Sequence, residues 1–176
     1  MGRKLLNEEL NRLSIDDFKK SPKVPIIVVL DNIRSLSNIG SVFRTADAFA
    51  IEAVYLCGIT AKPPHREIHK TALSATESVE WVYFKSTEEA VRSLKERNYI
   101  IVSIEQVEDS IMLYDFEASN ESIYALIFGN EVKGVDDNII AMSNYCVEIP
   151  QWGTKHSLNI SVTVGIVLWD IVLKLK

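Results

Sequence analysis

Cysteine is scarce in this chain of 176 residues, which contains only Cys57 and Cys146. The two are far apart and have no CxxC spacing, and each lies in or at the end of an apolar, strand-like run. We therefore expect buried thiols rather than a metal or redox site. Internal repeats, low-complexity segments and long linkers are also missing, so the length favours one compact domain with a substantial core.

The sequence has no apolar run long enough to span a bilayer, because Asp170 and Lys174 interrupt the longest one. Residues 1–13 show no apolar core followed by a small-residue cleavage site, and Leu6 stands where a myristoylation signal has Ser or Thr. An apolar content of 47% with 24% charged residues is ordinary for a soluble globular protein. We therefore expect a cytoplasmic protein with no membrane partner.

An excess of positive charge is absent, since the formal net charge is −5. This argues against a uniformly basic nucleic-acid binder. It leaves room for a local basic patch, because contacts with phosphate depend on local rather than total charge.

Several well-known site fingerprints are missing too. There is no GxGxxG and no GxxxxGK[ST], which disfavours the usual dinucleotide and P-loop sites. His156 stands next to Ser157, but adjacent side chains rarely face each other and no GxSxG occurs. We therefore do not expect a serine hydrolase.

What the sequence does contain is an alternation of apolar strands and amphipathic helices. Continuous apolar runs are typical of strands buried on both faces, so the pattern predicts an α/β fold with a parallel sheet covered by helices on both faces. Residues 1–23 read as a polar helical lead-in in which Ser14 caps a short turn. The predicted strands are 25–30, 52–58, 81–84, 99–106, 123–129 and 145–150, and the predicted helices are 37–50, 87–98 and 136–143.

The last segment is ambiguous. Ser157, Asn159, Ser161 and Thr163 alternate with apolar residues, as in a strand, whereas the residues from Gly165 onward are apolar nearly all round. Length favours a loop that runs into a buried helix, but periodicity alone leaves both structures open.

Three predicted strands are followed by unusual polar loops, which begin after Leu30, Phe128 and Ile149. Ligand sites of parallel α/β sheets lie at the carboxyl ends of the strands, so we expect the site where these loops converge. Each loop also has an ordinary explanation. Arg44 could extend along a helix that Asn38 caps, "GNEVKG" could be a polar turn, and Ser157 could cap a core helix.

Taken together, these loops resemble the SpoU family of RNA ribose 2′-O-methyltransferases, in the SPOUT superfamily. The resemblance runs from Val24 to Leu173. It is carried by "NIGSVFRTAD" (38–47), "KTALSATESVEW" (70–81), "FGNEVKGV" (128–135) and "IPQWGTKHSLNISV" (149–162). It implies one methyltransferase domain over 24–176 after the lead-in, a C-terminal trefoil knot, a homodimer and S-adenosylmethionine as cofactor. The apolar tail after Gly165 would then supply core and dimer surface.

The resemblance also implies the site residues. The matching polar positions around the methyl group and the ribose are Asn38, Arg44, Glu131, Ser157 and Asn159. The matching cofactor positions are Gly129, Ile149 and Leu158, with Glu105 as a weaker candidate. Guanidinium is very hard to deprotonate, so we expect Arg44 to stabilise charge rather than act as a base. The leaving group is already cationic before it departs, so this chemistry needs no metal.

Two stretches depart from the family pattern. Gln151 and Trp152 replace part of an "IPM-G" sequence, and Ser74 stands where glycine is usual. For RNA contacts we expect the loop with Lys62, Arg66 and Lys70, and Arg12 of the lead-in, although a solvated charged surface explains the same residues.

The predicted function is S-adenosylmethionine-dependent methyl transfer to a ribose 2′-hydroxyl of tRNA or rRNA. A knotted RNA-binding protein without turnover is the first alternative. A nucleotide-binding α/β protein of different chemistry is the second, and the missing glycine fingerprints disfavour it.

Overall fold

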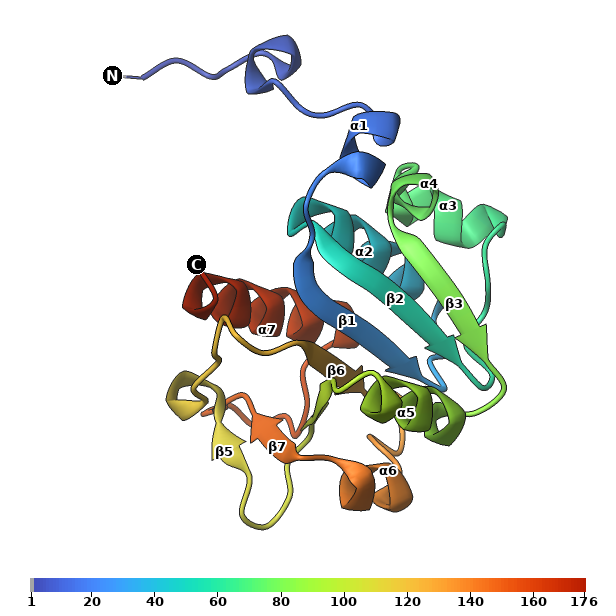
Figure 1. The fold of residues 1–176 in the computed structure, drawn as a ribbon, viewed down its shortest axis with the longest axis vertical. Helices are drawn as coiled ribbons and strands as arrows, with labels where there is room; N and C mark the ends of the chain where they lie inside the picture. Colours follow the sequence, from blue (N-terminus) through green and yellow to red (C-terminus); the bar gives the residue numbers. More distant parts are fainter. Residues whose placement is uncertain (1) are drawn as a thin grey trace.

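A computed structural model describes residues 2–176, so Met1, the first residue of the expected lead-in, lies outside it. Within these residues, seven parallel strands form one sheet in the order β3-β2-β1-β6-β4-β7-β5 (Figure 1). The predicted parallel sheet is therefore confirmed. The strands are β1 (Val24–Asp31), β2 (Ile51–Cys57), β3 (Glu80–Phe84), β4 (Ile100–Ile104), β5 (Ile111–Met112), β6 (Tyr124–Phe128) and β7 (Tyr145–Glu148).

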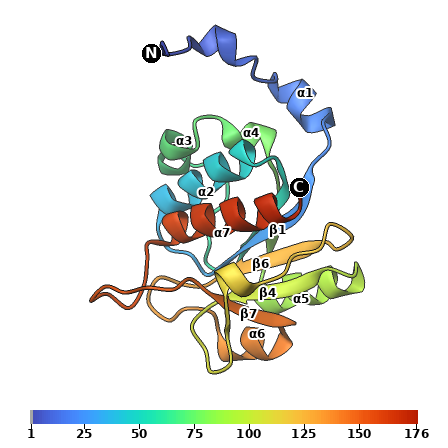
Figure 2. The same cartoon turned by 90° about the vertical axis from the view of Figure 1, so that its left-hand side faces the viewer.

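Helices cover both faces of this sheet, as the sequence predicted (Figure 2). One face carries α2 (Leu36–Ala48), α3 (Arg66–Ala72), α4 (Ala75–Ser78) and α7 (Ile160–Lys174), and the other carries α5 (Thr87–Glu96) and α6 (Asp137–Met142). Across residues 2–176, no helix has both the length and the apolar character that crossing a membrane requires.

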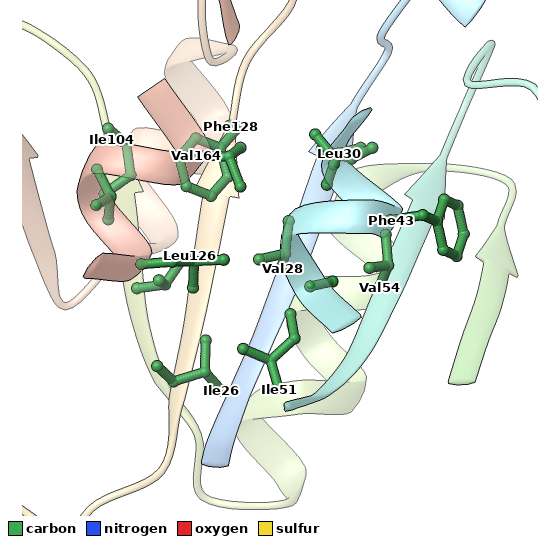
Figure 3. Close-up of a cluster of buried hydrophobic side chains, with 14 of the residues drawn as sticks. Ile26, Val28, Leu30, Phe43, Ile51, Val54, Ile104, Leu126, Phe128 and Val164 are labelled. Atoms are coloured by element: carbon green, nitrogen blue, oxygen red, sulfur yellow. The ribbon is translucent and has the colours of Figure 1, made fainter. Parts of the chain in front are cut away.

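The core has two layers because the central strands are buried on both sides. In β1, Ile26, Val28 and Leu30 face α2 and α7, while Ile27 and Val29 face α5 and α6. Figure 3 shows the first layer, where side chains of neighbouring strands meet Phe43 of α2 and Val164 of α7. This double burial explains why the strands are apolar at every position instead of every second one. Of the two free thiols, that of Cys57 is buried and that of Cys146 is partly buried.

The lead-in contains a 3₁₀ turn, η1 (Asn7–Leu10), and a short helix, α1 (Ile15–Lys20). Ser14 caps α1 as predicted, since its Oγ accepts the Asp17 N–H at 3.1 Å. The segment that precedes α1 runs away from the body of the molecule (Figures 1 and 2).

The segment expected to be a basic loop is partly helical, which corrects the prediction for residues 62–70. α3 begins after His65, whose Nδ1 accepts the Glu67 N–H at 3.2 Å. Buried Ile68 and Ala72 hold α3 against α2. The helices come close because Gly40 has no side chain: a Cβ there would lie 2.1 Å from Thr71 Oγ1 and 2.3 Å from the Ile68 carbonyl oxygen.

The backbone at Ser74, between α3 and α4, has a conformation that favours glycine. Its φ is +68°, in the left-handed region that favours glycine, and its side chain makes no capping hydrogen bond to α4.

We therefore expect Ser74→Gly to raise the free energy of unfolding by about 0.5–1 kcal/mol, since relief of backbone strain exceeds the entropy cost of glycine. Urea denaturation measures this. The matched control is Ser86→Gly at the start of α5, where φ is −143° and the hydroxyl accepts the Glu89 N–H at 3.2 Å. That control should lower stability slightly, and a similar loss for Ser74→Gly would contradict the explanation.

Candidate functional site

A cavity of about 580 Å³ lies at the carboxyl ends of β4, β6 and β7. Its volume is in the range of sites for small ligands. Four residues expected to bind the cofactor line it, namely Glu105, Gly129, Ile149 and Leu158. The lining also includes residues that the sequence did not single out, among them Gln106, Val132, Lys133 and Glu148. Only the spatial arrangement of the loops identifies these four.

The five polar candidates divide into two groups. Glu131, Ser157 and Asn159 line the cavity, whereas Asn38 and Arg44 do not. Asn38 is connected to the lining of the cavity by one hydrogen bond, in which Asn159 Nδ2 donates to Asn38 Oδ1 at 3.2 Å. Arg44 lines a second hollow, formed between α2 and α7. The structure therefore brings four of the five together and leaves Arg44 apart within one chain.

Glu131 joins the loop after β6 to the start of α2. Its two carboxylate oxygens accept the backbone N–H groups of Arg34 and Ser35, each at 3.2 Å. The Asn38 side chain contributes to lowering the pKa of the same carboxylate, and Asn159 donates a hydrogen bond to Asn38 in turn. Glu131, Asn38 and Asn159, which we call the polar bridge, thus connect the loops after β1, β6 and β7.

Hydrogen bonds from backbone N–H groups favour the ionised form of Glu131. Partial burial opposes ionisation, but hydrogen bonds from its own backbone, from Arg34 and Ser35 and from the Asn38 side chain outweigh it. The net effect is a pKa below the ordinary value of a glutamate.

The loop 130–134 is a tight turn whose ends are joined by two backbone hydrogen bonds, at 3.0 and 2.8 Å, between Asn130 and Gly134. A Cβ on Gly129 would lie 2.1 Å from the Gly134 carbonyl carbon, and one on Gly134 would lie 2.2 Å from Glu105 Oε2. Close packing against backbone therefore requires glycine at position 129, whereas a left-handed φ of +73° favours glycine at position 134.

Glu105 supports this turn from outside. One of its carboxylate oxygens accepts the Val135 N–H and the other the Gln106 N–H, both at 2.9 Å. Asn130, which sequence reasoning did not select, ties the turn to the loop after β1 by donating to the Asn32 carbonyl at 2.6 Å. The only indication in the sequence was its place between Gly129 and Glu131.

The alternation from Ser157 to Thr163 resolves into a loop and the first turn of α7. The helix begins at Ile160, so a strand over 160–164 is excluded. Asn159, and not Ser157, caps it: its Oδ1 accepts the Ser161 N–H at 2.9 Å and the Ser161 hydroxyl at 2.7 Å. The Thr163 hydroxyl donates to the Asn159 carbonyl at 3.2 Å. Similarly, Ser35 rather than Asn38 caps α2.

Another buried polar group lies beside the site. Asp31, at the end of β1, accepts hydrogen bonds from Asn32 Nδ2 at 2.9 Å and from the Thr87 hydroxyl. Burial is the main cause that raises its pKa above the ordinary value, and nearby Asp136 adds to it. Asp31 does not line the cavity, so we assign it to the attachment of α5 and the β1 loop.

The RNA-binding candidates occupy two places. Lys62 Nζ lies 4.3 Å from the centre of the Tyr83 ring, and Arg66 and Lys70 follow on α3. Lys70 is paired with Glu67 at 2.7 Å, an exposed contact that leaves its charge accessible to phosphate. Arg12 lies on the lead-in, beyond the amino end of β1 and therefore away from the cavity (Figure 1).

Comparison with known proteins places the chain in a family. Residues 25–169 match the model of the SpoU rRNA Methylase family. The chain is 28% identical over 169 residues to the tRNA (guanosine(18)-2′-O)-methyltransferase of Aquifex aeolicus, covering 94% of this chain and 76% of that one. It is 27% identical to the 23S rRNA (guanosine-2′-O-)-methyltransferase RlmB of Neisseria meningitidis, covering 90% and 62%.

A solved structure agrees in fold. The SpoU methyltransferase AviRb of Streptomyces viridochromogenes, in complex with AdoMet, superimposes with a TM-score of 0.78 at 23% identity, covering 89% of this chain and 63% of that one. The chain thus spans about three-fifths of AviRb and of the Neisseria protein. It belongs to the SpoU rRNA methylase family, which confirms the resemblance seen in its sequence.

Glu131→Gln tests the polar bridge. We expect it to lower the free energy of unfolding at pH 7 by about 1 kcal/mol, a figure discounted for the exposure of the carboxylate. Because the folded-state pKa of Glu131 is lowered, its contribution is present above the ordinary glutamate pKa and lost as pH falls below it. The difference in the free energy of unfolding between variant and wild type should therefore disappear below about pH 4. Urea denaturation at several pH values measures it.

Glu121→Gln, at an exposed glutamate outside the polar bridge, is the matched control and should change little at any pH. A gap for Glu131→Gln that persisted unchanged into acid would show that its carboxylate charge is not what stabilises the three loops.

Proposed function

We propose that the protein transfers a methyl group from S-adenosylmethionine to a ribose 2′-hydroxyl of a structured RNA, a tRNA or an rRNA. Membership of the SpoU family supports the reaction. Relatives named as tRNA and 23S rRNA 2′-O-methyltransferases support the substrate class. The observation that carries the proposal for this chain is the polar bridge at the rim of a ligand-sized cavity.

The residues of the cavity fit the proposed donor. Backbone groups of Gly129, Ile149 and Leu158 are available for the adenosine part, and the carboxylates of Glu131 and Glu148 favour a cationic sulfonium. When bound, S-adenosylmethionine supplies an activated methyl group on a positively charged sulfur. Glu105 also holds the turn 130–134 in place, because its carboxylate accepts the Val135 N–H.

The protein must then stabilise the ribose oxygen as its proton leaves. A guanidinium stays charged at any physiological pH and stabilises negative charge, so Arg44 serves as an electrostatic stabiliser. Ser157 and Asn159, on the rim of the cavity, orient the ribose. Asn38 and Glu131 hold Asn159 in place through the polar bridge.

The position of Arg44 supports a homodimer. The hollow that it lines also contains Phe49, the residue directly after α2, together with Ile166 and Trp169 of α7. Val162, Ile166, Trp169 and Leu173 form an apolar stripe along α7, with 37–59% of each side chain exposed. In a dimer built on this α2–α7 face, Arg44 of the partner subunit reaches the cavity that one chain leaves incomplete.

A trefoil knot and a single domain over 24–176 belong to the same proposal. β7 lies between β4 and β5, so the connection from β4 to β5 crosses the strand that leads to α7. α7 is held at its far end by Lys174, whose Nζ donates to the Leu113 carbonyl at 2.7 Å. This order of strands supports a C-terminal segment that passes through a loop. The surface with Lys62, Arg66 and Lys70 binds RNA phosphates, and Arg12 extends that contact from the lead-in.

Transfer of a tritiated methyl group from S-adenosylmethionine to total tRNA, and separately to rRNA, tests the function. We expect incorporation into one of them by the wild type. Arg44→Ala should lower the rate by about 100-fold or more, with little change in cofactor affinity because Arg44 is assigned to the ribose oxygen and not to the cofactor.

Arg92→Ala is the matched control: Arg92 lies on α5, on the opposite face, paired with Glu88 at 2.6 Å. It should leave the rate unchanged. Near-normal turnover by Arg44→Ala would refute its assigned role. Absence of incorporation into both RNA pools by the wild type would favour an RNA-binding protein without turnover.

The division of the site between two chains has its own test. Arg44→Ala and Asn159→Ala are each expected to be inactive alone. If Arg44 acts across the dimer, a heterodimer of the two variants has one complete site, so the co-expressed mixture should recover roughly a quarter of wild-type activity. If Arg44 acts within its own chain, every site of the heterodimer is defective. An inactive mixture that contains proven heterodimers would therefore rule out the shared site.

A further inference from the structure

The loop between β7 and α7 forms one lip of the cavity and carries an exposed indole. Gln151, His156 and Ser157 of this loop line the cavity. Trp152 is 90% exposed, more than any other large apolar side chain in the part of the chain that the structure describes. Figure 2 shows the loop projecting from the body of the molecule.

Thr154, Lys155 and His156, which follow Trp152 in the chain, are exposed and polar or cationic. The apolar stripe of α7 and the α2–α7 hollow do not include Trp152. An isolated aromatic side chain among cationic and hydroxyl-bearing residues matches the composition of single-stranded nucleic-acid sites, where bases stack on aromatic rings and cations meet the backbone.

We propose that the Trp152 indole stacks on a base of the substrate RNA, that of the target nucleotide or of its direct neighbour, while Lys155 meets the phosphate backbone. This inference rests on the proposed function, since it takes the ribose to lie against Ser157 and Asn159. The same short loop carries Trp152 and Ser157, so a base attached next to that ribose comes within reach of the indole. Every base has a π-face, so this contact adds affinity and does not select the base.

Kinetics of three variants separate stacking from simple apolar contact. Trp152→Ala and Trp152→Leu should raise the KM for the RNA pool that accepts methyl groups by about fivefold or more, with kcat nearly unchanged. Trp152→Phe keeps an aromatic ring and should stay close to wild type. Tyr114→Ala, at an exposed aromatic residue outside this loop, is the matched control and should change neither parameter. Affinity for S-adenosylmethionine should be the same in all four variants.

A fluorescence measurement of RNA binding detects the contact between Trp152 and RNA without any methyl transfer. Addition of unfractionated tRNA, or of 23S rRNA, should quench indole fluorescence of the wild type, and the main quenched component should be missing in Trp152→Phe. Because this readout needs no methyl transfer, it remains informative if the wild type methylates neither RNA, a result that would count against the proposed function alone.

Three results would overturn the inference. One is an unchanged RNA KM in Trp152→Ala together with undiminished quenching in Trp152→Phe. Another is a loss of S-adenosylmethionine affinity in Trp152→Ala with RNA affinity intact, which would assign the indole to the cofactor. The third is dissociation of a dimer in Trp152→Ala, measured by sedimentation, which would assign it to a second copy of the chain.

Discussion

The contact between Asn159 and Asn38, extended by Glu131, is the interaction on which the site depends. Parallel strands bring their carboxyl ends to one edge of the sheet, but they do not fix how the loops beyond that edge lie. Here one carboxylate accepts two backbone N–H groups at the start of α2, and one amide caps α7 while donating to α2. The polar bridge thereby positions two helix termini and a glycine turn relative to one another, and the cavity is the space that they enclose.

This arrangement also explains how the chemistry is distributed. The cavity provides backbone groups and carboxylates suited to a cationic donor, while Arg44 lies in the α2–α7 hollow beside an exposed apolar stripe. In the proposed dimer, Arg44 acts at the ribose oxygen, where negative charge develops, and the carboxylates of the cavity are left to face the cationic donor.

The sequence predicted the parallel sheet, the two helical faces and the family, because apolar runs and contiguous motifs are local properties. It did not predict α3, since buried Ile68 and Ala72 are too few to show a helical period, or the exchange of capping roles from Ser157 to Asn159. Gly129 was expected to approach the ligand, and the structure adds a packing reason, its contact with Gly134. Asn130 was missed because its partner, the Asn32 carbonyl, lies 98 positions away in the chain. Hydrogen bonds between residues so far apart in the chain produce no periodic pattern in the sequence.

A double-mutant cycle on S-adenosylmethionine affinity tests the central claim most directly. Glu131→Gln and Asn159→Ala change residues that both contact Asn38, so the polar bridge predicts that their effects are not additive. The expected coupling is about 0.5 kcal/mol or more, and it should vanish when Asn38→Ala is present in every member of the cycle. Additive effects in the wild-type background would contradict the account, because Glu131 and Asn159 would then act independently and the three loops would not be held as one site.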